Sequence, residues 1–78
     1  MNKLDKFLYR LDKKTRTVIE KIITLIVLGD FSILDIKKLK GSKNMYRVRV
    51  GKIRVIFEQT KNSNKIKDIS YRDDNTYS

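Results

Sequence analysis

The first third of the chain carries hydrophobic residues at helical spacing. The opening segment follows the i, i+3, i+4, i+7 pattern of an amphipathic helix at Leu4, Phe7, Leu8 and Leu11. After the polar break at Asp12-Lys13-Lys14, a second and longer helix is predicted from about Thr15 to Leu28, and Gly29 is expected to end it. The two predicted helices are interpreted as a hairpin that contributes core and scaffold.

In the middle of the chain, hydrophobic and polar residues alternate instead. Residues 45–50 and 53–58 show this alternation, which predicts two strands joined by a two-residue turn at Gly51-Lys52. In this register Arg49 lies opposite Arg54. One face of the predicted hairpin is wholly apolar, and its members are Tyr46, Val48, Val50, Ile53, Val55 and Phe57.

The remaining segments complete a small α+β domain. Residues 31–40 are predicted to be a connection, and residues 61–64 a turn before a third strand at residues 65–71. The apolar residues of that third strand fall on both faces, a pattern that suits a central strand. The expected fold is a two-helix hairpin packed on a three-stranded antiparallel sheet, as a single domain over residues 1–78.

The second face of the predicted hairpin gathers three arginines, Arg47, Arg49 and Arg54. Like charges placed directly opposite each other destabilise a strand pair, and a local conflict of this kind is typical of a working surface. Converging guanidinium groups bind phosphate well, because their planar forks match its oxygens. This face is therefore a candidate phosphate site.

The charge balance of the whole chain points in the same direction. Its 19 Lys and Arg residues against 9 Asp and Glu give a formal net charge of +10, which indicates a polyanionic partner, nucleic acid first and an anionic membrane second. No acidic residue lies between Asp35 and Glu58. The candidate RNA-binding residues in this stretch are Lys37, Lys38, Lys40, Lys43 and Lys52.

Composition excludes several classes of site. The chain has no Cys and no His, so it lacks a thiolate nucleophile, the usual metal ligands and the usual general base. We expect no cofactor and no metal. The absence of Cys fits a reducing cytoplasm, and no apolar run approaches the roughly 20 residues that span a bilayer. We therefore expect a cytoplasmic protein that binds nucleic acid rather than membrane.

A series of short motifs along the chain occurs together in one known family. The motifs are Leu39-Lys40-Gly41, Tyr46-Arg47-Val48-Arg49-Val50-Gly51, Ile53-Arg54-Val55-Ile56-Phe57-Glu58 and Tyr71-Arg72-Asp73-Asp74 followed by Tyr77. In this order they resemble the RelE/ParE toxin superfamily of bacterial and archaeal toxin–antitoxin systems. The resemblance covers nearly the whole chain and implies a small antiparallel sheet packed against two helices. Family members usually have a strand before the first helix, which this sequence lacks, and an exposed sheet edge that can pair with a partner strand is the expected result.

The resemblance to RelE-type members also implies an activity, the cleavage of mRNA in the ribosomal decoding site. The protein would be the toxin of a type II toxin–antitoxin system and a metal-independent endoribonuclease, with mRNA, the ribosome and a cognate antitoxin as partners. Arg54 matches the family's phosphate-stabilising arginine, and Tyr77 is the candidate general base. The residues that match catalytic positions are Arg47, Arg49, Arg54, Arg72 and Tyr77.

Two departures from the family pattern leave other functions open. The strand positions that are often Lys are Arg47 and Arg49 here, and an arginine stays protonated at neutral pH, so neither accepts a proton. The family's frequent His before the terminal arginine is replaced by Tyr71. The alternatives are a ParE-like inhibitor of DNA gyrase and a catalytically inactive member that binds nucleic acid.

Overall fold

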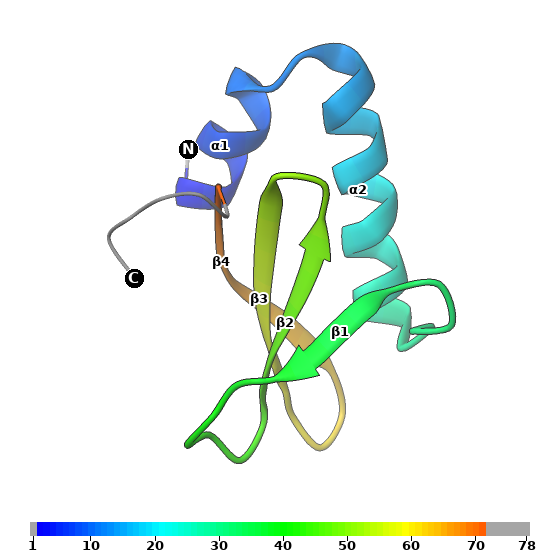
Figure 1. Ribbon diagram of the computed structural model, residues 1–78, viewed down its shortest axis with the longest axis vertical. Coiled ribbons are helices and arrows are strands. Elements are labelled where there is room, and N and C mark those ends of the chain that lie inside the picture. The colour runs from blue at the N-terminus through cyan, green and yellow to red at the C-terminus, as the bar shows by residue number, and fades with distance from the viewer. Residues whose placement is uncertain (1, 72–78) are drawn as a thin grey trace.

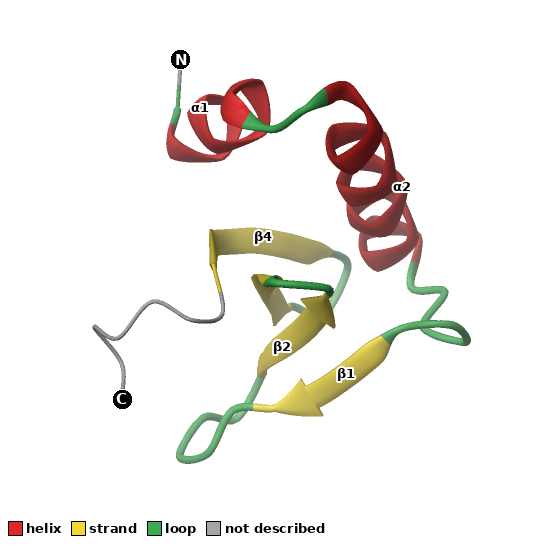
Figure 2. Cartoon of the chain, turned by 45° about the horizontal axis from the view of Figure 1, so that its top comes forward, coloured by secondary structure: helices red, strands yellow, loops and turns green. Residues whose placement is uncertain are grey.

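Two helices lie on one face of a four-stranded antiparallel sheet in the computed structural model, which describes residues 2–71 (Figures 1 and 2). The strands follow the order β1-β2-β3-β4 across the sheet. The elements are α1 (Lys3–Arg10), α2 (Lys13–Leu28), β1 (Asp35–Lys38), β2 (Met45–Val50), β3 (Ile53–Gln59) and β4 (Asn64–Tyr71). The α+β class predicted from the sequence is confirmed, and α2 begins two residues before the predicted Thr15.

Side chains at the connection between α1 and α2 fix the ends of both helices. Asn2 caps α1 by accepting a hydrogen bond of 2.8 Å from the backbone N–H of Asp5. Asp12 caps α2, and hydrogen bonds from the side chain and then the backbone of Thr15 hold the pKa of Asp12 below its ordinary value. Arg16 of α2 donates to the carbonyl oxygens of Leu8 (3.1 Å) and Leu11 (3.0 Å), which ties the end of α1 to the start of α2.

Helix α2 ends at Gly29, the glycine that was expected to end it. Gly29 has a φ of 79°, in the left-handed region, where glycine carries no Cβ penalty. The N–H of Gly29 donates to the carbonyl of Ile26 and that of Asp30 to the carbonyl of Leu25, a Schellman-type end. The Asn64 side chain adds a 2.8 Å hydrogen bond to the carbonyl oxygen of Ile26, which anchors the end of α2 beside the start of β4.

The central hairpin has the register that its alternation predicts. Arg49 pairs with Arg54 and Val48 pairs with Val55. Gly51 has a φ of 58° and no other residue among those described, apart from two further glycines, has a positive φ. A positive φ at the first turn position alone is the type II′ arrangement, whose twist matches that of the flanking strands.

A fourth strand, β1, lies inside the segment predicted to be a connection. It pairs antiparallel with β2, so the prediction of a three-stranded sheet is wrong. Its four residues include a single apolar side chain, Ile36, and three charged ones. So short and charged a segment shows no hydrophobic alternation, although it is typical of an edge strand protected from pairing with other chains.

β4 forms the opposite edge of the sheet, so the prediction of a central third strand is also wrong. Ile56 pairs with Asp68, whereas its neighbour Phe57 pairs with Ile66. Lys67 is therefore an extra residue in β4 and forms a β-bulge. Beyond the bulge, side chains that would have pointed to one face of the sheet point to the other. The bulge returns Ile66 to the face that carries Ile69, which explains why the apolar residues of this strand do not alternate. No strand precedes α1 within residues 2–71.

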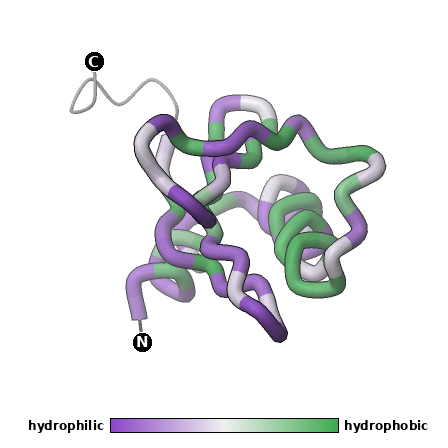
Figure 3. The backbone as a smooth tube through the Cα atoms, turned by 90° about the horizontal axis from the view of Figure 1, so that it is seen from below, coloured by the Kyte–Doolittle hydropathy of each residue, from purple (hydrophilic) through white to green (hydrophobic). Residues whose placement is uncertain are grey.

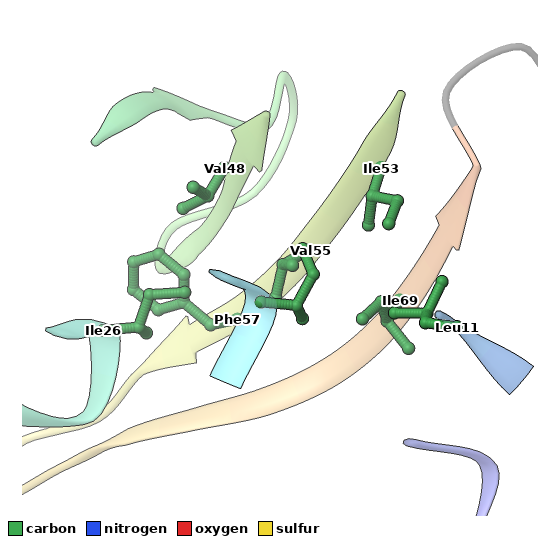
Figure 4. Packing of buried hydrophobic residues seen from close by; sticks show 8 residues of the cluster. Leu11, Ile26, Val48, Ile53, Val55, Phe57 and Ile69 are labelled. Atoms are coloured by element: carbon green, nitrogen blue, oxygen red, sulfur yellow. The ribbon is translucent and has the colours of Figure 1, made fainter. Parts of the chain in front are cut away.

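The core lies between the helices and one face of the sheet. Figure 4 shows Ile26 directed toward Phe57 and Leu11 directed toward Ile69. A row of apolar side chains, Ile36, Val48, Val55 and Ile69, crosses all four strands on this face. In Figure 3, α2 is the most continuous hydrophobic segment of the tube. The buried residues are Leu11, Ile19, Ile26, Val48, Ile53, Val55, Phe57 and Ile69.

Substitution of Gly29 should test the end of α2. Gly29→Ala places a Cβ on a left-handed residue and is expected to lower the free energy of unfolding by about 1–2 kcal/mol. Gly29→Asn should lower it less, because Asn tolerates this conformation better. Chemical denaturation of the three proteins measures the difference. No contact opposes an added Cβ at Gly29, so equal stability of wild type and Gly29→Ala would contradict the proposed role of backbone conformation.

Candidate nucleic-acid interface

Successive side chains of a strand point to opposite faces of the sheet, and this alternation puts several cationic side chains on the face away from the helices. We call this the arginine face and define it by Asp35, Lys37, Arg47, Arg49 and Arg54. One row across the four strands reads Asp35, Arg49, Arg54 and Ser70. The next row begins with Lys37 opposite Arg47. No helix among residues 2–71 lies on this face (Figure 2), and the predicted convergence of three arginines is present there.

Asp35 adds a carboxylate that the sequence analysis did not assign to the site. Its Oδ2 atom accepts a hydrogen bond of 3.1 Å from Nε of Arg49, and its Oδ1 atom lies 3.9 Å from Nη1 of Arg47. Asp35 was placed only as the boundary of the stretch without acidic residues. Recognition of β1 as a strand would have revealed its place, since parity then puts Asp35 beside Arg49.

Arg47 differs from the other arginines in its burial. Its side chain is 14% exposed, against 42% for Arg49. The Nη1 atom of Arg47 is buried and makes no hydrogen bond with any residue of the described chain. A buried donor that lacks an acceptor is costly, and a guanidinium nitrogen satisfies this need best with an anionic oxygen. The local chemistry therefore favours an anion at this position.

The candidate RNA-binding lysines lie at several separate places. Lys37 is on the arginine face, whereas Lys38 pairs with Tyr46 on the helix side of the sheet. Lys40 and Lys43 are exposed on the loop between β1 and β2, at one end of the hairpin. Lys52 is in the turn at its other end, about six residues of strand away, or roughly 20 Å. The structure thus brings only Lys37 next to the arginines.

Two candidate catalytic residues, Arg72 and Tyr77, lie outside the described residues.

Within residues 2–71, no helix has the length and apolar character needed to cross a bilayer. The same part of the chain contains no group of three or more His, Cys, Asp or Glu side chains arranged to hold a metal ion.

A second feature is an apolar groove of about 650 Å³ between the start of α2 and the turn of the β2–β3 hairpin. Val18 and Tyr71 line it and are each 46% exposed. Its charged lining residues are Asp12, Lys14 and Lys52. Val50 and Ile53, which also line the groove, are the chain neighbours of Arg49 and Arg54.

Comparison with known proteins adds one informative similarity. No family model and no curated protein matches the sequence. Among solved structures, the chain is similar to a chain of the RelB–RelE antitoxin–toxin complex from Methanococcus jannaschii, with a TM-score of 0.72 and 30% sequence identity. The match covers 86% of this chain and 81% of that chain. This chain belongs to the RelE-like toxin family. The RelE-like fold inferred from the sequence motifs is thereby confirmed.

Within this RelE-like domain, the arginine face should be dispensable for folding. Arg54→Ala opens no cavity in the core and removes one of the two like charges that face each other at Arg49 and Arg54, so the free energy of unfolding should stay within about 1 kcal/mol of wild type. Ile53→Ala, at the neighbouring buried position, should lower it by about 2–5 kcal/mol. Urea denaturation measures both. A loss of several kcal/mol in Arg54→Ala would show that Arg54 is structural.

Proposed function

We propose that this RelE-like chain is the toxin of a type II toxin–antitoxin system and a metal-independent endoribonuclease that cleaves mRNA on the ribosome. The observation that carries the proposal is the cationic cluster of Lys37, Arg47, Arg49 and Arg54 on one sheet face. A rigid sheet holds the guanidinium groups in place before substrate arrives. Such preorganised donors stabilise the charge that develops on phosphoryl oxygens in a transition state.

The proposed reaction uses the 2′-hydroxyl of RNA as nucleophile. The 2′ oxygen forms a bond to the adjacent phosphorus and loses its proton, while the bond from phosphorus to the 5′ oxygen breaks and that oxygen gains a proton. The products are a 2′,3′-cyclic phosphate and a 5′-hydroxyl. DNA lacks the nucleophile and should not be cleaved.

Each candidate residue receives a role in this proposal. Arg54 and Arg72 stabilise the developing charge on the phosphoryl oxygens. Arg47 and Arg49 hold the flanking phosphates, and Tyr77 serves as general base. The lysines of the β1–β2 loop and of the hairpin turn are assigned to more distant RNA or ribosome contacts, since only Lys37 adjoins the arginines.

A cognate antitoxin is the second proposed partner, in a cytoplasmic setting. The similar structure from Methanococcus jannaschii is an antitoxin–toxin complex, and the net charge of +10 favours an acidic partner. We assign an amphipathic acidic segment of the antitoxin to the groove between α2 and the hairpin. Its apolar side would cover Val18 and Tyr71, and its carboxylates would face Lys14 and Lys52.

The catalytic proposal predicts specific losses of activity. Arg54→Ala should reduce the rate of mRNA cleavage about 10²–10³-fold with the fold intact, because one charge-stabilising donor is lost. Tyr77→Phe removes only the hydroxyl and should reduce the rate by about 10² or more. Primer-extension mapping of mRNA ends in a translation extract measures both rates.

Three results, two from that experiment and one from a parallel DNA-cleavage assay with gyrase, would change the proposal. Folded Arg54→Ala that cleaves at the wild-type rate would remove the arginine face from catalysis. A fully active Tyr77→Phe would show that Tyr77 is not the general base. DNA breaks in the presence of gyrase, without any mRNA cleavage, would establish the ParE-like alternative instead.

The antitoxin assignment predicts a position-dependent effect along α2. Val18→Glu puts a carboxylate into the proposed contact and should weaken antitoxin binding at least about 10-fold. Val27→Glu is a matched control, because Val27 is 52% exposed on the same helix and lies outside the groove. Calorimetric titration with purified antitoxin compares the two. Equal weakening by both substitutions, or none by Val18→Glu, would place the antitoxin elsewhere.

A further inference from the structure

The carboxylate of Asp35 occupies a position between two arginines of the arginine face. It lies opposite Arg49 in the register of β1 and β2 and diagonal to Arg47. One of its oxygens accepts a hydrogen bond of 3.1 Å from Nε of Arg49, and the other lies 3.9 Å from Nη1 of Arg47. The same carboxylate group thus reaches toward both guanidinium groups with a different oxygen.

A phosphodiester presents the same chemistry to this pair of arginines. Carboxylate and phosphate both carry oxygens that match the fork of a guanidinium group. Asp35, however, satisfies only part of the site, since Nη1 of Arg47 is buried and has no hydrogen-bond acceptor in the described chain. A phosphodiester has two non-bridging oxygens that are not tethered to β1, so one of them can replace the contact at Arg49 while the other moves close enough to Arg47 to fill the unmet one.

We infer that Asp35 holds the place of an RNA phosphate between Arg47 and Arg49, and that RNA binds by displacing it. This inference rests on the proposed function for its ligand, an RNA phosphodiester. It makes Asp35 a residue that sets the affinity of the site, in competition with substrate, rather than one that takes part in the reaction.

The exposure of the pair shows that displacement is easy. The Asp35 side chain is 55% exposed and that of Arg49 is 42% exposed. Exposed ion pairs are weak because water and salt screen them and because two side chains lose freedom. An internal competitor of this strength weakens phosphate binding by only about two- to fivefold. Asp35 therefore selects ligands that engage Arg47 as well, since a ligand that reaches Arg49 alone gains little over the carboxylate it replaces.

The test compares RNA binding by two proteins that lose the same charge. Asp35→Asn removes the competing carboxylate with little change in shape. Glu20→Gln removes one negative charge from the exposed side of α2, away from the arginine face, and controls for net charge. The probe is a fluorescein-labelled 2′-O-methyl RNA oligonucleotide, which lacks the attacking hydroxyl and so reports binding without cleavage. Fluorescence anisotropy gives the dissociation constants, and far-UV circular dichroism checks that β1 remains folded.

Asp35→Asn should bind the probe about two- to fivefold more tightly than wild type, and Glu20→Gln should bind nearly as wild type does. The gain should disappear when Asp35→Asn is made in an Arg49→Ala background, because the carboxylate acts through Arg49. Equal binding by Asp35→Asn and Glu20→Gln would overturn the inference. Weaker binding by folded Asp35→Asn would also overturn it, since Asp35 would then position the arginines for RNA.

Cleavage is assayed separately, so the two proposals can fail independently. Tighter probe binding by Asp35→Asn, without mRNA cleavage by any of the proteins, would support the role of Asp35 and contradict the endonuclease. Cleavage by wild type with no gain in binding from Asp35→Asn would leave the endonuclease standing and remove the role of Asp35. A failure of all the proteins to bind the RNA probe would overturn the inference.

Discussion

The contact between Ile19 and Ile26 of α2 and the apolar side of the sheet is the interaction on which the rest of the domain depends. These two side chains, with Val48, Val55 and Phe57, have no exposed surface. Because side chains alternate across a strand, burial of these residues leaves Arg47, Arg49 and Arg54 no position except the opposite face. A slip of one residue in the hairpin would exchange the two sets. The packing of the core therefore also places the cationic cluster.

The same core packing explains how so small a domain tolerates two arginines directly opposite each other in its sheet. Arg49 and Arg54 face each other across β2 and β3, which costs electrostatic energy. The apolar row that crosses the four strands on the other face lies under the helices and offsets this cost. Asp35, on the edge strand β1, offsets part of the repulsion between Arg49 and Arg54 through its ion pair with Arg49. The same carboxylate competes with any anion that approaches the two arginines. Stability and anion binding thus compete for the same guanidinium groups.

Two surfaces of different chemistry lie on the two faces of the central hairpin. The arginine face is polar and cationic, and the groove beside α2 is largely apolar, with Asp12, Lys14 and Lys52 as its charged lining residues. Val50 and Ile53 belong to the groove, and their neighbours Arg49 and Arg54 belong to the arginine face. Alternation along the two strands therefore puts these chain neighbours on opposite faces of the sheet. A partner in the groove and a nucleic acid on the arginine face would therefore lie on opposite sides of the same hairpin.

The sequence by itself determined the features that depend on local periodicity. The spacing of Leu4 to Leu11, the glycine at position 29 and the alternation on either side of Gly51-Lys52 were enough to predict two helices, the end of α2 and the register of the hairpin. The convergence of the three arginines followed from that register. These features could be predicted because each is set by residues close together in the chain. Only the tertiary structure decided the edges of the sheet. β1 has a single apolar residue and so shows no alternation, and it pairs with β2 through residues 8 to 14 positions apart. The bulge at Lys67 changes which face the side chains of β4 point to. The position of Asp35 between Arg47 and Arg49 depends on that pairing, because a carboxylate and its partners on different strands meet only when the sheet is formed.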